Sequence, residues 1–125
     1  MVFETLTSFV DEKSIARLTI LRPQVHNALN MELIREMRQA LREMEGLRTL
    51  VLTGEGKTFC AGGDLKWMEE MTKQEVSGRM KDAEELALML SELNRVPFPV
   101  IGRINGPAYG LSLIHISEPT RPIHI

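Results

Sequence analysis

The stretch that decides the fold is Phe59-Cys60-Ala61-Gly62-Gly63-Asp64-Leu65, which follows the apolar run Leu50-Val51-Leu52. The apolar run predicts a buried strand, and the spacing after the glycines predicts a helix. Glycine lets the backbone turn sharply and lets a ligand approach the main chain, and Asp64 is placed to cap the helix through its side-chain oxygen. Free N–H groups at such a helix start suit an oxyanion, which predicts a site for an enolate or tetrahedral oxyanion derived from a thioester.

Strands and helices alternate on both sides of this stretch, which predicts an α/β domain with parallel pairing and right-handed crossovers. Strands are expected at 2–10, 15–21, 47–53 and 100–104, and helices from Asn30 to Gly46, at 65–71 and after Thr72. The second strand alternates with one buried face, whereas the third is apolar enough to be covered on both faces. Asn30 and Thr72 are the expected N-caps, Thr72 with Glu75 in the capping-box position.

A second glycine turn, Asn105-Gly106-Pro107-Ala108-Tyr109-Gly110, follows the last expected strand. A glycine pair before a helix can be only a tight turn, so Gly62 and Gly63 alone define no site. In a parallel sheet, however, the C-terminal ends of adjacent strands form the usual ligand crevice. The two turns are therefore expected to direct N–H groups at one oxygen.

Three segments in chain order carry a family resemblance: Arg22-Pro23 with Asn27-Ala28-Leu29, then 59–65, then 104–110. Together they resemble the successive signatures of the crotonase superfamily, the enoyl-CoA hydratase/isomerase family, over residues 3 to 110. The resemblance implies the N-terminal part of a spiral of ββα turns, truncated before a C-terminal helical part that builds trimers. It also implies a coenzyme A thioester as substrate, with no separate cofactor.

The resemblance assigns a role to each matching site residue. Gly63 would supply the first oxyanion-hole N–H to the thioester carbonyl, and Ala61 would offer its carbonyl towards the adenine of coenzyme A. The remaining expected binding residues are Asp64, Leu65 and Lys66 in the groove, with Val25 and Ala28 near the nucleotide end. His26 is expected to be an ordinary loop residue, Cys60 a small buried residue, and Trp67 a packing or acyl-contacting residue.

The chain departs from the family pattern after Gly110, where Leu111 and Ser112 replace the glycines that should carry the second oxyanion donor. Residues 111–121 resemble a translated sequencing adapter, so 1–110 is expected to be an incomplete core and 111–125 a non-native tail. The catalytic glutamates of hydratases lie beyond this point. The chain is therefore expected to be inactive, and the alternative is a non-catalytic fragment or a nucleotide- or CoA-binding module.

Length, charge and hydropathy exclude several other classes of protein. The 125 residues allow one domain, and the net charge of −2 gives no argument for nucleic acid. No apolar run could span a bilayer and no signal peptide is visible, so a cytoplasmic protein without a membrane or metal site is expected. The homotrimer or hexamer of the family is not expected for this chain. A serine protease on the related Clp-type fold is not favoured, because no serine outside the tail follows the glycine turn in the position of a nucleophile.

Overall fold

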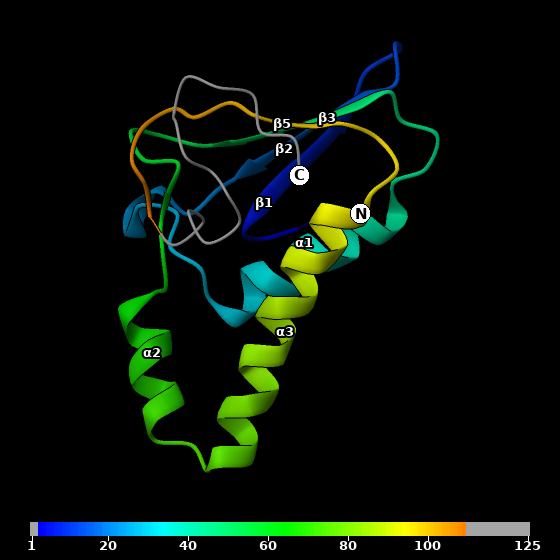
Figure 1. Ribbon diagram of the computed structural model, residues 1–125. Coiled ribbons are helices and arrows are strands. Elements are labelled where there is room, and N and C mark those ends of the chain that lie inside the picture. Colours follow the sequence, from blue (N-terminus) through cyan, green and yellow to red (C-terminus); the bar gives the residue numbers. More distant parts are fainter. Residues whose placement is uncertain (1–2, 110–125) are drawn as a thin grey trace.

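The computed structural model describes residues 3–109 (Figure 1). The strands are β1 (Leu6–Val10), β2 (Ile15–Ile20), β3 (Thr49–Gly54), β4 (Cys60–Ala61), β5 (Val100–Gly102) and β6 (Ala108–Tyr109). The helices are the 3-10 turn η1 (Pro23–Val25), α1 (Met31–Glu43), α2 (Leu65–Thr72) and α3 (Val76–Arg95). No helix among residues 3–109 is both long and apolar enough to cross a membrane.

Successive turns of the chain lie beside one another as a spiral. The larger sheet has the order β1-β2-β3-β5, in which β1 and β2 are antiparallel and the other pairs are parallel. A smaller parallel sheet joins β4 to β6, with Cys60 opposite Ala108. Each later turn of the chain thus adds one strand to each sheet, which is the expected ββα spiral of the crotonase fold and confirms the predicted class.

One face of the larger sheet carries the core, and α1 and α3 lie below it in Figure 1. Along β2 the burial alternates as the sequence predicts, with Ala16, Leu18 and Ile20 facing inward. Apolar residues recur every three or four positions along α1, which is the period of an amphipathic helix. Its buried members are Leu33, Ile34, Met37, Ala40 and Leu41.

Charged contacts hold α1 against α3 at the edge of this core. The Arg38 guanidinium donates to Glu85 at 2.6 Å and to Glu92 at 2.7 Å. These carboxylates raise the pKa of Arg38, and the hydrogen bond that Arg38 donates to Glu92 contributes most. These ion pairs therefore add a polar connection between α1 and α3 to their apolar contacts.

Several sequence-based boundaries are corrected by the structure. β1 begins at Leu6, and β5 ends at Gly102 because the chain leaves the sheet before the second glycine turn, inside which β6 forms. Within residues 3–109 β3 is fully covered on one face only, because Val51 on the other face remains half-buried. These differences bear on the site, since β6 places the second turn beside β4.

The predicted capping box at Thr72 is wrong. Thr72 is the last residue of α2, where its hydroxyl donates to Glu69 O at 2.7 Å. The N-cap of α3 is Glu75, which makes no side-chain cap hydrogen bond. The threonine hydroxyl thus closes the preceding helix, a local bond that competes with capping the next one.

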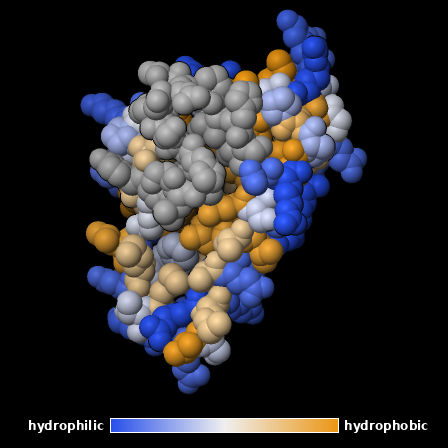
Figure 2. Space-filling view, in the orientation of Figure 1, coloured by the Kyte–Doolittle hydropathy of each residue, from blue (hydrophilic) through white to orange (hydrophobic). Residues whose placement is uncertain are grey.

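The outer half of α3 does not pack as its sequence predicts. Val76 and Met80 stand at helical spacing with the buried Met89 and Leu93, yet they are exposed. Figure 2 shows apolar surface over the lower parts of α2 and α3. The large exposed apolar residues of these two helices are Leu65, Met68, Val76, Met80 and Leu88.

Candidate functional site

The site begins where Leu29 pairs with the glycine stretch. Leu29 N–H donates to Gly62 O at 2.6 Å, and Asp64 N–H donates to Leu29 O at 2.8 Å, so that Leu29 and Gly63 form a parallel bridge. In a parallel ladder these two bonds flank Gly63, so its own N–H points to the opposite side. Within residues 3–109 the Gly63 N–H makes no hydrogen bond. An unpaired backbone donor is therefore held in a fixed direction.

Asp64 starts α2 immediately after this donor. Its carboxylate Oδ1 accepts from Lys66 N–H at 2.8 Å and Trp67 N–H at 3.2 Å, which confirms the predicted N-cap. The cap leaves Gly63 at the positive end of an eight-residue helix. The arrangement favours negative charge next to the Gly63 N–H.

Arg22 fixes Asp64 from the other side. Its guanidinium lies 2.9 Å from Asp64 Oδ2, with each side chain 11% exposed, and it also donates to Ala28 O. Burial raises the pKa of Asp64, but the Arg22 hydrogen bond and the N–H groups of Trp67 and Lys66 outweigh it and hold the pKa below its ordinary value. Arg22 thereby ties the Asn27–Leu29 loop to the start of α2.

The lowered pKa of Asp64 predicts an acid-sensitive contribution to stability. Because the folded state favours the carboxylate, its contribution is present above the unfolded pKa, about 3.9, and is lost as the pH falls through the folded value. Asp64→Asn is expected to lower the free energy of unfolding by about 1–3 kcal/mol at neutral pH. Urea titrations from pH 7 to pH 3 should show the difference from wild type shrinking below about pH 4. A difference independent of pH would show that the charge of Asp64 does not contribute.

A cleft of about 550 Å³ opens beside these groups. Its lining residues are Val25, His26, Ala28, Ala61, Gly63, Asp64, Leu65 and Lys66. The structure thus brings all seven sequence-predicted site residues to one cleft, although their roles towards a ligand stay predictions. Apolar side chains from the η1 loop and from α2 form most of its wall.

His26 is the lining residue that the sequence reasoning missed. It was expected to be an ordinary loop residue, yet it lies between Val25 and Ala28 on the wall of the cleft. The signal available in the sequence was this position, because its neighbours on both sides were already site candidates. No cluster of three or more His, Cys, Asp or Glu residues that could hold a metal ion occurs in the described part of the chain.

Asn27 supports the cleft from behind. Its side chain is fully buried, accepts from Arg22 N–H at 2.8 Å and donates to the carbonyls of Glu55 and Thr58. Its φ of +59° is a left-handed conformation that asparagine adopts more readily than most residues. This one side chain therefore connects the loop that carries His26 to the turn after β3.

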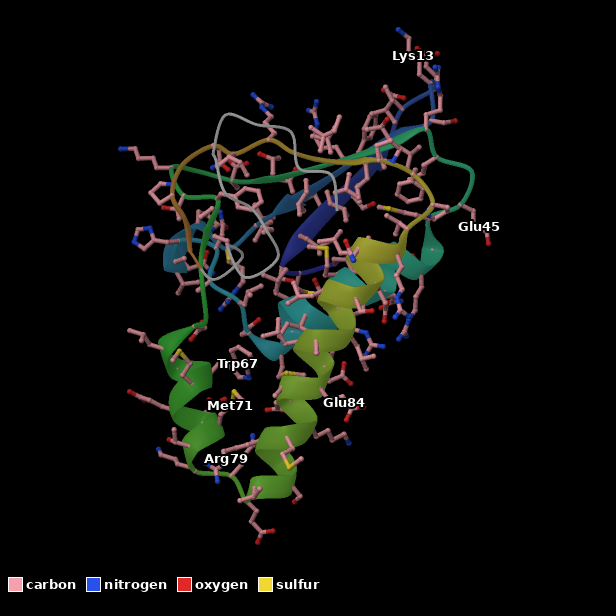
Figure 3. All side chains as sticks on the ribbon, viewed as in Figure 1. Lys13, Glu45, Trp67, Met71, Arg79 and Glu84 are labelled. Carbon is pink, nitrogen blue, oxygen red and sulfur yellow. The ribbon has the colours of Figure 1, made fainter. Side chains whose placement is uncertain are left out.

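Cys60 and Trp67 lie behind the cleft, in the core. Burial raises the pKa of the Cys60 thiol, which agrees with the prediction of a small buried residue rather than a nucleophile. Trp67 is 8% exposed and lies, like Met71, on the side of α2 that faces α3 (Figure 3). Its indole Nε1 has no hydrogen-bond partner among the described residues. Trp67 therefore contributes packing at the base of α2.

The second glycine turn packs against the chain before β4. Asn105 donates to Gly56 O at 2.8 Å, and a methyl group at Gly106 would lie 1.8 Å from Lys57 O, so only glycine fits there. The pairing of Ala61 with Tyr109 places the end of this turn beside the start of the first one. That the two turns direct N–H groups at one oxygen stays a prediction. The expected second donor after Gly110, with Leu111, Ser112 and the tail 111–125, falls outside the described residues.

Comparison with known proteins gives a consistent assignment. Residues 11–113 match the family model described as enoyl-CoA hydratase/isomerase. The enoyl-CoA isomerase/hydratase fer4 of Mycosarcoma maydis is 34% identical over 107 residues, which cover 77% of this chain and 38% of that protein. The crystal structure of an enoyl-CoA hydratase from Shewanella pealeana superposes with a TM-score of 0.79 at 33% identity, covering 83% of this chain and 40% of that one. An enoyl-CoA hydratase from Mycobacterium smegmatis gives 0.74 at 33% identity, with coverages of 81% and 40%.

The ββα spiral, with a donor N–H at the start of α2, defines a crotonase-type α/β protein. The chain belongs to the enoyl-CoA hydratase/isomerase family. It spans about 40% of the length of the relatives it matches and corresponds to the N-terminal part of their fold.

Proposed function

We propose that this chain binds an acyl-CoA thioester in the cleft and that Gly63 N–H donates to the thioester carbonyl. The observation that carries the proposal is that this N–H is unpaired among the described residues and points in a direction that the bridge between Leu29 and Gly63 fixes. Asp64 adds to it by capping α2, so that the donor lies at the positive end of the helix. The nucleotide end of coenzyme A would then contact Ala61, Val25 and Ala28. The binding groove would be lined by Leu65 and Lys66.

The reaction that this geometry serves is hydration or isomerisation of an enoyl-CoA. Addition at the β-carbon, or removal of an α-proton, moves negative charge onto the thioester oxygen. A preorganised donor at that oxygen stabilises the charge by roughly 3 kcal/mol. The family resemblance implies that the acid–base carboxylates and the second donor lie after residue 110, so we expect this chain alone to bind thioester without turning it over.

A second candidate function is a CoA-binding module that performs no chemistry. The same cleft favours it, since most of its lining residues would contact the nucleotide and groove rather than the reacting carbonyl. The two candidates differ in whether bound thioester is polarised at its carbonyl. They share the binding step, which is tested first.

Calorimetric titration of the purified 125-residue chain with coenzyme A and crotonyl-CoA tests the binding step. Lys66→Ala is expected to weaken binding about 3- to 10-fold, the range for a partly exposed charge contact. Lys81→Ala removes the same charge from an exposed position on α3 that does not line the cleft, and it should bind like wild type. Absence of saturable binding by the folded wild-type chain would refute the proposal, as would equal losses in the two variants.

A further inference from the structure

One side of α3 carries exposed apolar side chains at alternating spacings of four and three residues. This α3 stripe consists of Val76, Met80, Ala83 and Ala87. Because successive residues of a helix are turned by about 100° around its axis, the stripe lies roughly 130° from the buried pair Met89 and Leu93. Apolar surface over the lower part of α3 is visible in Figure 2. The stripe therefore faces away from the core of the described chain.

The spacing of the α3 stripe is the one by which two helices pack along a common seam. In such a seam, apolar residues recur alternately after three and four positions. The small side chains of Ala83 and Ala87 let a second helix axis approach closely. The helix is also preformed, since the ion pairs of Arg38 with Glu85 and Glu92 hold it against α1. Association therefore does not require the entropic cost of forming the helix.

Charged residues of opposite sign flank the α3 stripe. Arg79 precedes Met80 and lies on the side of α3 towards α2, whereas Glu84 follows Ala83 and lies on the opposite side (Figure 3). Within residues 3–109 neither charged side chain makes an ion pair or hydrogen bond. Residues in these flanking positions form the salt bridges between paired helices that set their orientation.

These two charges are complementary to those of an identical helix. If two copies of α3 pack parallel and in register, Arg79 of one copy lies opposite Glu84 of the other, and the two-fold axis repeats the pair. In an antiparallel pair, the Arg79 flanks of the two copies would face each other without a carboxylate opposite. The pattern of charges thus favours a second copy in parallel orientation.

We propose that the α3 stripe binds a second copy of this chain, with the two α3 helices parallel and in register. The inference goes beyond the proposed function, because no residue of the stripe lines the cleft. The apolar seam drives the association, and the two symmetric pairs of Arg79 with Glu84 select its orientation. From Val76 to Ala87 the seam is about 16 Å long, which makes it a small interface and the dimer a weak, concentration-dependent one.

Sedimentation velocity of the purified 125-residue chain over a range of concentrations tests the proposal. The wild-type chain is expected to show a reversible equilibrium of monomer and dimer. Ala83→Glu places a carboxylate in the middle of the seam and should weaken dimerisation at least about 10-fold, because an unpaired charge would be buried. Leu88→Glu is the matched control, since it introduces the same charge at an exposed apolar position of α3 outside the stripe. It should dimerise like wild type.

A charge exchange tests the orientation. Arg79→Glu is expected to weaken dimerisation about 10-fold, because both symmetric pairs become repulsive. Combined with Glu84→Arg, it restores opposite charges at both pairs and should return dimerisation to near the wild-type level. Circular dichroism checks that each variant folds.

Two results would overturn the second copy as the occupant of the stripe. One is a wild-type chain that stays monomeric at every concentration, and the other is an equal loss of association in Ala83→Glu and Leu88→Glu. Failure of the doubly exchanged variant to regain association, when Arg79→Glu alone has lost it, would overturn the parallel arrangement.

Discussion

Gly63→Pro is expected to abolish the polarisation of a bound thioester carbonyl, whereas Gly63→Ala keeps it. Proline has no N–H, so the substitution removes the proposed donor without breaking any hydrogen bond among the described residues. Alanine keeps the N–H, and its methyl group would meet the flexible Met68 side chain, with Sδ at 3.1 Å. In an enzyme that turns substrate over, losing one such donor lowers kcat by roughly 10²- to 10³-fold.

Infrared difference spectra of bound crotonyl-CoA, labelled with ¹³C at the thioester carbonyl, measure this polarisation in the chain itself. The carbonyl band should move to lower frequency on binding to wild type and to Gly63→Ala, and return to the free position in Gly63→Pro. Circular dichroism and urea titration check that both variants fold. A shifted band in a folded Gly63→Pro chain would mean that another group polarises the carbonyl, and the oxyanion role of Gly63 would be refuted.

The glycine stretch was accessible from sequence because its chemistry is local. A capping aspartate after two glycines needs no distant partner to be recognised, and Asp64 does cap α2. The same holds for the alternation along β2, where Ala16, Leu18 and Ile20 are all buried. Local periodicity and capping thus predicted the elements that frame the cleft.

Non-local contacts were not accessible in this way. The pairing of Leu29 with Gly63 joins residues far apart in the sequence, and it is this pairing that fixes the direction of the donor. β4 and β6 have two residues each, too few to show a period. Arg22 was recognised only as part of a motif, and its bond to Asp64 came from the structure.

Predictions for the region after Gly110 cannot be compared with the structure. The second oxyanion donor and the adapter-like tail were predicted from residues that lie outside the described part of the chain, so both stay predictions. What the described part does add is the placement of β6 beside β4, with Ala61 opposite Tyr109. The chain therefore reaches the neighbourhood of Gly63 again just before residue 110, where a second donor would be needed.

Asn27→Ala is expected to be the most destabilising of the polar substitutions around the cleft. The change leaves Arg22 N–H and Glu55 O without their partner, whereas Thr58 O keeps a bond from Asn105. Each buried group left unpaired costs about 1–3 kcal/mol, and alanine in a left-handed conformation adds about 1 kcal/mol. Because both groups are only partly buried, the lower part of that range applies to each, and the free energy of unfolding in urea should fall by about 3–5 kcal/mol in total. Asn94→Ala, at an exposed position of α3, should change it by less than about 0.5 kcal/mol.

Asn27→Asp separates the shape of this side chain from its hydrogen-bonding pattern. The introduced carboxyl has the same size, but it would place oxygen where Nδ2 now donates to Glu55 O at 2.8 Å and Thr58 O at 2.7 Å. Repulsion from these carbonyls, together with full burial, raises the folded-state pKa of that carboxyl above its unfolded value of about 3.9. A group with a raised pKa binds more protons when folded, so the variant loses stability as the pH rises through that interval. The deficit relative to wild type should thus be small near pH 3 and large at pH 7, because in this variant the introduced carboxyl must ionise in the folded state. A deficit of equal size at both pH values would show that geometry alone, and not the donor pattern of the Asn27 amide, holds the loop in place.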